Sequence, residues 1–216
     1  MVPLAFRLPR RARLLCLGAH ADDIEIGCGG TVLRLLREHP GLRVHWLVLS
    51  AAGRRADEAR ASAHRFLGRA QGVVEIEGFR DGYLPAVRAE VKDRFERLKR
   101  ALDPDLILTH HEGDLHQDHD LIGRLTRETF RDHAILGYEV PKYDGGLGMP
   151  NVFVPLDAAT RRRKVRLLLA GFPSQRAKRW FSPETFDALM RLRGIECAAP
   201  SGYAEAFHGR KLVLEP

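Results

Sequence analysis

Short apolar segments alternate with helical patterns along the first 140 residues, and this alternation restricts the fold more than any other feature of the sequence. Five apolar runs are predicted to be buried strands, at residues 14–19, 44–50, 73–79, 105–109 and 134–139. Apolar residues at helical spacing fill the intervals, at residues 31–38, 57–67, 87–102 and 119–130. Apolar strands separated by helices are typical of a parallel sheet covered on both faces. The sequence therefore predicts a doubly wound, Rossmann-like α/β fold with a mainly parallel sheet.

The length of the chain sets the expected domain organisation. The 216 residues suffice for one α/β domain and are too few for two of ordinary size. We expect a single domain over residues 1–216, with a core at 12–140 and a C-terminal elaboration at 141–216. After a loop at 142–151, the elaboration is predicted to contain a strand at 152–156, helices at 160–170 and 183–193, and an edge strand at 211–214.

The charge of the chain bears on its partners. Lys and Arg outnumber Asp and Glu by 35 to 28, and the net charge is +7. Most arginines are scattered over predicted helices, and the run Arg161 to Lys164 is typical of a solvated helix face, so we expect no specific nucleic-acid partner. The excess positive charge points instead to an anionic small-molecule substrate. Three widely spaced cysteines, and the lack of any apolar stretch long enough to span a membrane, predict a cytoplasmic protein.

Two polar clusters follow the first and the fourth predicted strands. Residues 18–23 read Gly-Ala-His-Ala-Asp-Asp, and residues 110–119 contain four histidines and two aspartates. In the strand order 3-2-1-4 of a doubly wound sheet, strands one and four are neighbours. Ligands bind beyond the carboxyl ends of the strands at this switch point. Two segments some ninety residues apart in sequence are therefore predicted to meet at the place this fold most often uses for function.

A metal ion is the ligand that these residue types favour. Imidazole nitrogens and carboxylate oxygens are zinc ligands, and a catalytic zinc site combines three protein ligands with one position open for water. Histidine and aspartate at a strand end also serve as caps and turn formers. Two such clusters at adjacent strand ends favour the metal over that simpler role.

The motifs in these clusters resemble those of the LmbE-like, or PIG-L, deacetylases. Residues 19–23, Ala-His-Ala-Asp-Asp, followed by Gly-Cys-Gly-Gly at 27–30, resemble the family's opening signature, and His-Gln-Asp-His at 116–119 resembles its second. The resemblance implies a zinc cofactor, with ligands at His20, Asp23 and His119. It further implies Asp22 as general base, His116 as the group that stabilises the oxyanion and protonates the leaving amine, and Asp118 as the residue that orients His116. The implied substrate is a small N-acetylated sugar or its conjugate.

Two positions depart from the family pattern. Ala21 replaces the usual proline, which removes a restraint on the backbone of the ligand turn. Ile24 replaces a frequent acidic residue and touches no proposed ligand. We expect Gly27, Gly29 and Gly30 to allow a tight turn at a helix N-terminus or close packing beneath the site.

Further polar residues follow the other predicted strands. By resemblance to the family, Arg55 and Asp81 are candidates for binding a sugar or its attached group. The residues Tyr138, Glu139 and Lys142 come after the fifth strand, where they could face the same pocket. Flanking positions are expected to support the ligands or shape the loop, namely His110, His111 and Asp114.

The sequence leaves other functions open. A metal-dependent phosphoesterase would use similar residues with a second metal ion about 3.5–4 Å from the first. A non-catalytic basic binding protein, or a deacetylase inactivated through Ala21, would account for parts of the pattern. The sequence selects neither the acylated substrate nor the oligomeric state, although family members often form homo-oligomers.

Overall fold

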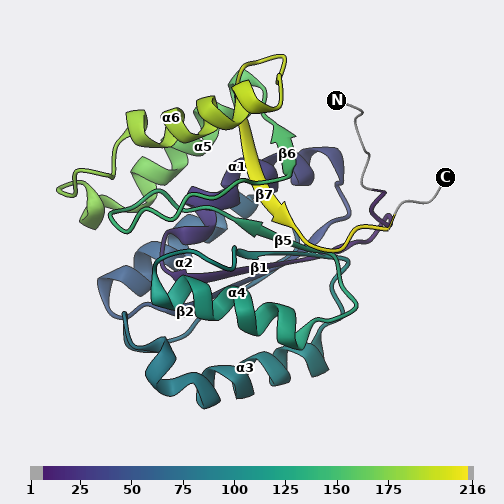
Figure 1. The fold of residues 1–216 in the computed structure, drawn as a ribbon, viewed down its shortest axis with the longest axis vertical. Coiled ribbons are helices and arrows are strands. Elements are labelled where there is room, and N and C mark those ends of the chain that lie inside the picture. The colour runs from purple at the N-terminus through teal and green to yellow at the C-terminus, as the bar shows by residue number, and fades with distance from the viewer. Residues whose placement is uncertain (1–6, 214–216) are drawn as a thin grey trace.

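The computed structural model describes residues 7–213, which form a seven-stranded sheet covered by helices on both faces (Figure 1). The strands lie in the order β3-β2-β1-β4-β5-β7-β6. Their bounds are β1 Arg13–His20, β2 Arg43–Ser50, β3 Gly72–Ile76, β4 Leu106–His110, β5 Ile135–Tyr138, β6 Val152–Pro155 and β7 Ala204–Gly209. The pairs among the first five strands are parallel, and β7 runs antiparallel to both β5 and β6. This confirms the predicted fold class and the predicted order of the first four strands.

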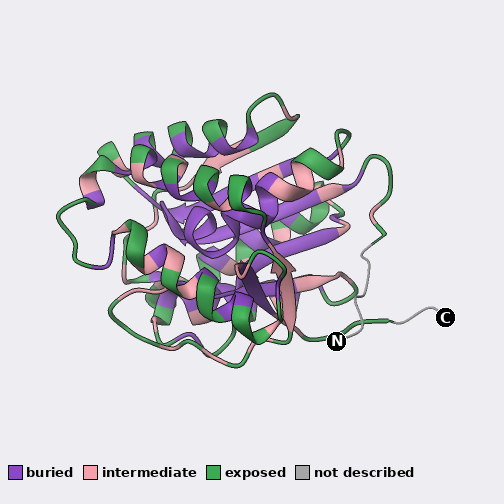
Figure 2. Ribbon diagram, turned by 90° about the horizontal axis from the view of Figure 1, so that it is seen from above, coloured by how far each residue is buried: buried purple, intermediate pink, exposed green. Residues whose placement is uncertain are grey.

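The helices form two layers, which Figure 1 shows above and below the sheet. Their bounds are α1 Asp23–Glu38, α2 Arg54–Leu67, α3 Arg88–Ala101, α4 Gln117–Thr129, α5 Ala158–Gly171 and α6 Pro183–Glu196, with short 3-10 turns η1 Leu84–Val87 and η2 Pro173–Gln175. Alternate side chains of β1 enter different cores: Leu14 packs in the core beside α1 and α2, and Leu15 in the core beside α3 and α4. Figure 2 shows the buried residues concentrated in the sheet between the layers.

Helix α1 begins at Asp23, eight residues before the predicted start at residue 31. The prediction was wrong because glycines have low helix propensity and favour turns, whereas tertiary packing overrides propensity here. A Cβ atom on Gly27 would lie 2.1 Å from the Tyr138 ring, and one on Gly29 would lie 2.7 Å from the Phe66 ring. A Cβ atom on Gly30 would lie 2.5 Å from Leu156. The glycines therefore allow α1 to pack closely against its neighbours, which is one of the two roles predicted for them.

The edge strand predicted at 211–214 is also wrong. Residues 211–213 form no strand, and residue 214 lies outside the described part of the chain. The seventh strand is β7, which inserts between β5 and β6. The sequence of β7 does not predict a buried strand, because the charged residue Glu205 interrupts its apolar residues. That carboxylate is nevertheless buried, since it pairs with Lys164 of α5 at 2.6 Å.

The parallel register places the functional clusters at one edge of the sheet. β1 pairs with β4 in parallel, with Cys16 opposite Leu108, so the two strands end at the same edge of the sheet, at His20 and His110. Among the helices formed by residues 7–213, none has the length and hydropathy needed to cross a bilayer.

Candidate metal centre

The first polar cluster lies in the turn from β1 into α1. Strand β1 ends at His20 and helix α1 begins at Asp23, whose carboxylate accepts a hydrogen bond from the His20 N–H at 2.6 Å. This bond closes the turn on itself. Ala21 is buried within the turn. The turn therefore forms with alanine at the position where the family pattern has proline, because a hydrogen bond supplies the restraint.

The second cluster lies between β4 and α4. His116 caps the N-terminus of α4, and His119 follows in the first turn of the helix. The Nδ1 atom of His119 lies 2.9 Å from an oxygen of Asp114, which makes Asp114 the hydrogen-bond acceptor for that ring N–H. The other ring nitrogen, Nε2, faces the first cluster. Asp114 thus orients His119 from the loop, as the sequence predicts for its position.

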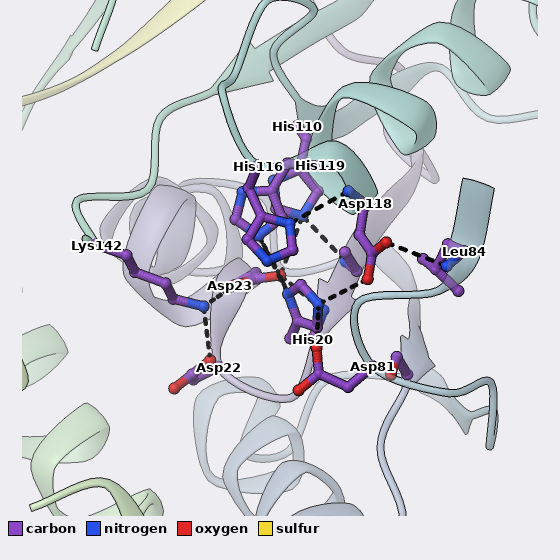
Figure 3. A network of polar contacts seen from close by, with 12 residues as sticks. His20, Asp22, Asp23, Asp81, Leu84, His110, His116, Asp118, His119 and Lys142 are labelled. Carbon is purple, nitrogen blue, oxygen red and sulfur yellow. Dashed lines mark hydrogen bonds and ion pairs between the residues drawn. The ribbon is translucent and has the colours of Figure 1, made fainter. Parts of the chain in front are cut away.

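Three atoms from the two clusters converge. His20 Nδ1 lies 3.1 Å from His119 Nε2 and 3.2 Å from Asp23 Oδ2, and His119 Nε2 lies 3.4 Å from the same oxygen. Figure 3 shows the three side chains pointing toward one another from β1, α1 and α4. Zinc bonds of 2.0–2.2 Å in tetrahedral geometry separate ligand atoms by about 3.3–3.6 Å, within a few tenths of an ångström of these values. The three separations therefore match those of ligands around one tetrahedral metal ion.

Each histidine of this triad also has a carboxylate behind it. His20 Nε2 lies 3.2 Å from Asp118 Oδ2 and 3.0 Å from Asp81 Oδ1, while Asp114 holds the far side of His119. Metal-bound histidines in proteins almost always donate their second ring N–H to such a partner, which fixes the ring and its tautomer. The donor set of two imidazoles and one carboxylate thus fits a divalent cation in both its inner and its outer contacts.

The charges of the cluster shift the pKa values of its members. Burial disfavours protonation of His20, but the nearby Asp23 and Asp118 carboxylates outweigh this and raise its pKa well above the usual value. Burial also opposes ionisation of Asp23, whereas Lys142, His119 and His20 together hold the pKa of its carboxyl well below the usual value. A cation that enters the triad therefore meets an ionised Asp23 and must displace protons from the histidines.

Asp22 is buried between two cations. Its Oδ2 atom lies 3.2 Å from Arg55 and its Oδ1 atom 3.4 Å from Lys142. The Arg55 guanidinium also pairs with Glu58 at 3.3 Å and lies over the Phe172 ring. The structure thus brings Arg55 to Asp22 from the first turn of α2. It also shows that Lys142, which the sequence marks with no motif, belongs to the cluster.

The carboxylate of Asp118 does not orient His116, in contrast to the prediction. It accepts hydrogen bonds from the Gly82 N–H at 2.8 Å and the Leu84 N–H at 3.1 Å, and it contacts His20. His116 is held instead by the main chain, since its Nδ1 accepts the Asp118 N–H at 3.2 Å. This arrangement follows from the position of His116 as the N-cap of α4, where its side chain faces the backbone N–H of Asp118.

The surroundings of His116 lower the pKa of its ring. Burial lowers its pKa, and the neighbouring His119 and His20 lower it further, against a weaker opposing effect of Asp118. Its ring stacks on that of His119 with centroids 4.4 Å apart. A neutral His116 that accepts at Nδ1 carries its proton on Nε2. His116 is therefore a hydrogen-bond donor at the edge of the triad.

Of the remaining candidate residues after β4 and β5, one contacts the candidate metal centre and the others pack or pair elsewhere in the fold. His110 contacts Asp23 at 3.2 Å, and burial lowers its pKa to about 3, so it is neutral and accepts the Ala19 N–H. Tyr138 is buried in the core, with its hydroxyl donating to the Leu17 carbonyl. Glu139 pairs with Arg193 at 2.7 Å. The His111 ring stacks on His208, away from the triad.

Sequence reasoning missed Glu25. This residue is fully buried in α1, and neither carboxylate oxygen has a hydrogen-bond partner among the described residues. Burial raises the pKa of its carboxyl to about 8, against an opposing effect of the nearby Ser62 hydroxyl, and Asp22 and Asp23 add smaller contributions. No signal in the sequence separates it from the solvated acidic residues that are common in the first turn of a helix.

Comparison with known proteins places these motifs in a family. A family model described as PIG-L, GlcNAc-PI de-N-acetylase, matches residues 15–130, a range that includes both clusters. The uncharacterized deacetylase YaiS of Escherichia coli is 29% identical over 147 residues, which cover 61% of this chain and 76% of YaiS.

Solved structures share the fold over nearly the whole chain. The conserved protein TT1542 of Thermus thermophilus has a TM-score of 0.72 at 26% identity, covering 95% of this chain and 97% of its own. The N,N'-diacetylchitobiose deacetylase of Pyrococcus horikoshii has a TM-score of 0.67 at 19% identity, covering 95% and 87%. GalB, a 4-carboxy-2-hydroxymuconate hydratase from Pseudomonas putida, has a TM-score of 0.74 at 18% identity, covering 95% and 99%. Proteins with this fold therefore catalyse different reactions, so an inference about the reaction has to rest on the residues of the site.

Proposed function

This chain belongs to the PIG-L de-N-acetylase family, and we propose that it is a zinc-dependent hydrolase that removes an acetyl group from the amide nitrogen of an amino sugar or its conjugate. The observation that carries the proposal is the convergence of His20, Asp23 and His119 at separations of 3.1–3.4 Å. Two imidazoles and one carboxylate are a ligand set of catalytic zinc sites. A zinc ion bound there supplies Lewis-acid polarisation of the amide carbonyl and acidifies a water molecule.

Asp22 is the proposed general base. It directly precedes the ligand Asp23, and its buried carboxylate has an oxygen, Oδ2, that makes no hydrogen bond within the described residues. Arg55 lies 3.2 Å from its Oδ2 atom and Lys142 3.4 Å from its Oδ1 atom. In the proposed mechanism this carboxylate takes a proton from water as the water attacks the amide. A positioned base of this kind contributes roughly 10²–10⁴-fold to the rate.

His116 is the proposed oxyanion donor. One of its ring nitrogens lies within 4.8 Å of a ring nitrogen of His20 and of one of His119, and the Asp118 N–H fixes the tautomer. Because its proton is on Nε2, a neutral His116 donates a hydrogen bond to the oxygen on which charge develops. The proton that Asp22 has taken then serves the leaving amine. Asp118 supports the reaction indirectly, by holding His20.

The proposed substrate class follows from the family and from the rim of the site. The family description and the P. horikoshii enzyme both name N-acetylated sugars. Asp81 lies at the rim, with its side chain 80% exposed, and Arg55 lies across the cluster against Asp22. We propose that both contact the sugar or its attached group. An anionic attachment agrees with the net charge of +7, and self-association remains a prediction.

Metal content and acetate release test this proposal together. We expect one zinc per chain and release of acetate from a panel of N-acetylated amino sugars and their phosphorylated conjugates. Asp22→Asn should retain the zinc and lose roughly 10²–10⁴-fold of the rate. Asp57→Asn, which changes an exposed aspartate of α2, is the matched control and should leave the rate unchanged.

Two results would contradict the proposal. Failure of the wild-type chain to bind metal stoichiometrically would remove its basis. Two metal ions per chain, with release of phosphate rather than acetate, would favour the phosphoesterase that the sequence also allowed.

A further inference from the structure

Lys142 reaches the candidate metal centre from the loop after β5, far from either motif. Its Nζ atom lies 2.6 Å from Asp23 Oδ1 and 3.4 Å from Asp22 Oδ1, and its side chain is only 14% exposed (Figure 3). The ammonium also lies 5.3 Å from the centre of the Trp180 ring. A lysine so enclosed has given up most of its hydration, so its contacts with the two carboxylates must compensate.

The two oxygens of Asp23 have different partners. Oδ2 faces His20 Nδ1, His119 Nε2 and the His20 N–H, whereas Oδ1 accepts a hydrogen bond from Lys142. A carboxylate can offer a metal ion one oxygen or both. Because Lys142 engages Oδ1, only Oδ2 points toward the histidines. The lysine thus divides the carboxylate between a cation of the protein and the triad.

The fold holds Lys142 in this position. Glu139, just before the loop, pairs with Arg193 of α6 at 2.7 Å and accepts the Gly148 N–H at 2.9 Å. Arg193 in turn donates to the Gly148 carbonyl at 3.1 Å. The loop that carries Lys142 is therefore fastened near both of its ends to a buried ion pair, which favours a fixed role for the lysine.

We propose that Lys142 is a positioning residue that restricts Asp23 to one oxygen for the metal ion and limits the affinity of the site for that ion. The inference rests on the proposed metal centre. A single carboxylate oxygen and two imidazole nitrogens leave a coordination position free, whereas a second carboxylate oxygen would occupy it. The positive charge of Lys142 also opposes a second cation nearby, so the lysine prevents the two aspartates from binding metal too tightly.

A purely structural lysine would behave differently. If Lys142 only neutralised Asp22 and Asp23, its removal would change zinc affinity and leave the coordination geometry as it is. If it divides the Asp23 carboxylate, its removal would tighten metal binding and change the coordination geometry. The coordination geometry therefore separates the two roles, and the comparison does not depend on enzyme activity.

The test uses the full chain, stripped of metal, as wild type, Lys142→Met, Lys142→Arg and Lys178→Met. Lys178 is the matched control, since its ammonium also lies over Trp180, at 5.9 Å, but on the exposed surface. Zinc affinity is measured by competition with a chelating dye, and geometry by the visible absorption of the cobalt-substituted protein, which distinguishes four from five ligands.

We expect Lys142→Met to bind zinc at least about tenfold more tightly and to show the weaker cobalt bands of a five-coordinate ion. Lys142→Arg keeps both the charge and an N–H donor, and should restore the wild-type affinity and spectrum, as should Lys178→Met. Melting curves of the metal-free chains show whether each variant is folded. If Lys142→Met is not, Lys142→Gln takes its place.

An unchanged cobalt spectrum, or zinc binding that is unchanged or weaker, in a folded variant without the charge, would overturn the role of Lys142. In that outcome the proposed function stands, because the wild type still binds its metal. A wild-type chain that binds no metal would overturn the metal centre itself. The two failures are thus distinguishable.

Discussion

Helix α1 touches two buried clusters of charge that serve different ends. At its N-terminus, Asp22 and Asp23 meet two histidines and Lys142. In its middle, Glu205 from β7 accepts hydrogen bonds from the Gly30 N–H, the Thr31 N–H and the Thr31 hydroxyl at 2.6–2.8 Å. Lys164 bonds both to Glu205 and to the Ile26 carbonyl, each at 2.6 Å.

The difference lies in how the polar atoms are satisfied. In the Lys164–Glu205 cluster each charged atom meets a complementary partner, so the cluster is complete as the chain folds. In the N-terminal cluster, two histidine nitrogens meet one carboxylate oxygen that already accepts the His20 N–H, and Asp22 Oδ2 pairs with Arg55 at 3.2 Å. Buried charge alone therefore does not identify a functional site. Several potential metal ligands gathered around one point do.

The largest effect should come from breaking the complete cluster. Glu205→Gln leaves the buried Lys164 ammonium without its counterion and should lower the free energy of unfolding by about 3–5 kcal/mol. Urea denaturation in the presence of a chelator measures this. A second change, Lys164→Met, should recover part of the loss in the double variant. A loss below about 1 kcal/mol would mean that the pair does not hold α1 in place.

Zinc should stabilise the chain only through the N-terminal cluster. At a free zinc concentration one hundred times the dissociation constant, the wild type should gain about 2.7 kcal/mol. His119→Gln should lose this gain, whereas Lys164→Met, although less stable, should keep it. Thermal or urea unfolding with and without zinc provides the measurement. A gain that Lys164→Met loses would show that the two clusters are not independent.

Glu25 is a buried carboxyl on the same helix, and among the described residues it contacts neither a lysine, as Glu205 does, nor the histidines, as Asp23 does. We expect it to make the free energy of unfolding depend on pH. Its pKa is raised from 4.5 to about 8, so between these values the folded chain holds a proton that the unfolded chain has released. Stability from this group is present below pH 4.5 and falls as the pH rises toward 8, by up to about 1.4 kcal/mol per pH unit.

Glu25→Gln should flatten that slope in the metal-free chain. Urea unfolding of wild type and variant at pH 5.5, 6.5 and 7.5 should show a difference that widens in favour of the variant. Parallel curves would mean that Glu25 is ionised in the folded chain and has a partner. That result would place Glu25 with the complete cluster.

The smallest effect should come from an exposed ion pair. Arg124 and Asp120 on α4 lie 2.8 Å apart one helical turn from each other. Arg124→Ala should leave the free energy of unfolding nearly unchanged, because solvent screens the pair. The same urea series measures it. A cost comparable to that of Glu205→Gln would undermine the use of burial to rank these clusters.

Local patterns predicted the features that local patterns control. The apolar runs predicted β1 to β5, and the predicted strand order brought the two polar clusters to one edge of the sheet. The selection of His20, Asp23 and His119 within those clusters came from the family resemblance. The start of α1 was missed, since its glycines respond to packing against distant side chains. Strand β7 was missed because a glutamate in a short apolar segment usually faces solvent. Glu205 is buried only because Lys164, 41 residues away in the sequence, pairs with it.

The roles of Asp118 and Lys142 were beyond local patterns for another reason. Asp118 was assigned to its neighbour His116, but its carboxylate bonds to main-chain groups 34 and 36 residues away. Lys142 contacts Asp23 across 119 residues of sequence, in a loop without a motif. Spacing along the chain reports side chains on one element, whereas these contacts depend on where a loop crosses the sheet.

The bonds from Glu205 to α1 span 174 and 175 residues, which has a consequence for the order of events during synthesis. A chain leaves the ribosome from its N-terminus, and its early parts begin to fold first. The three candidate ligands emerge within the first 119 residues, long before β7 at Ala204–Gly209. We therefore expect α1 to remain without these hydrogen bonds to Gly30 and Thr31 until β7 has been synthesised.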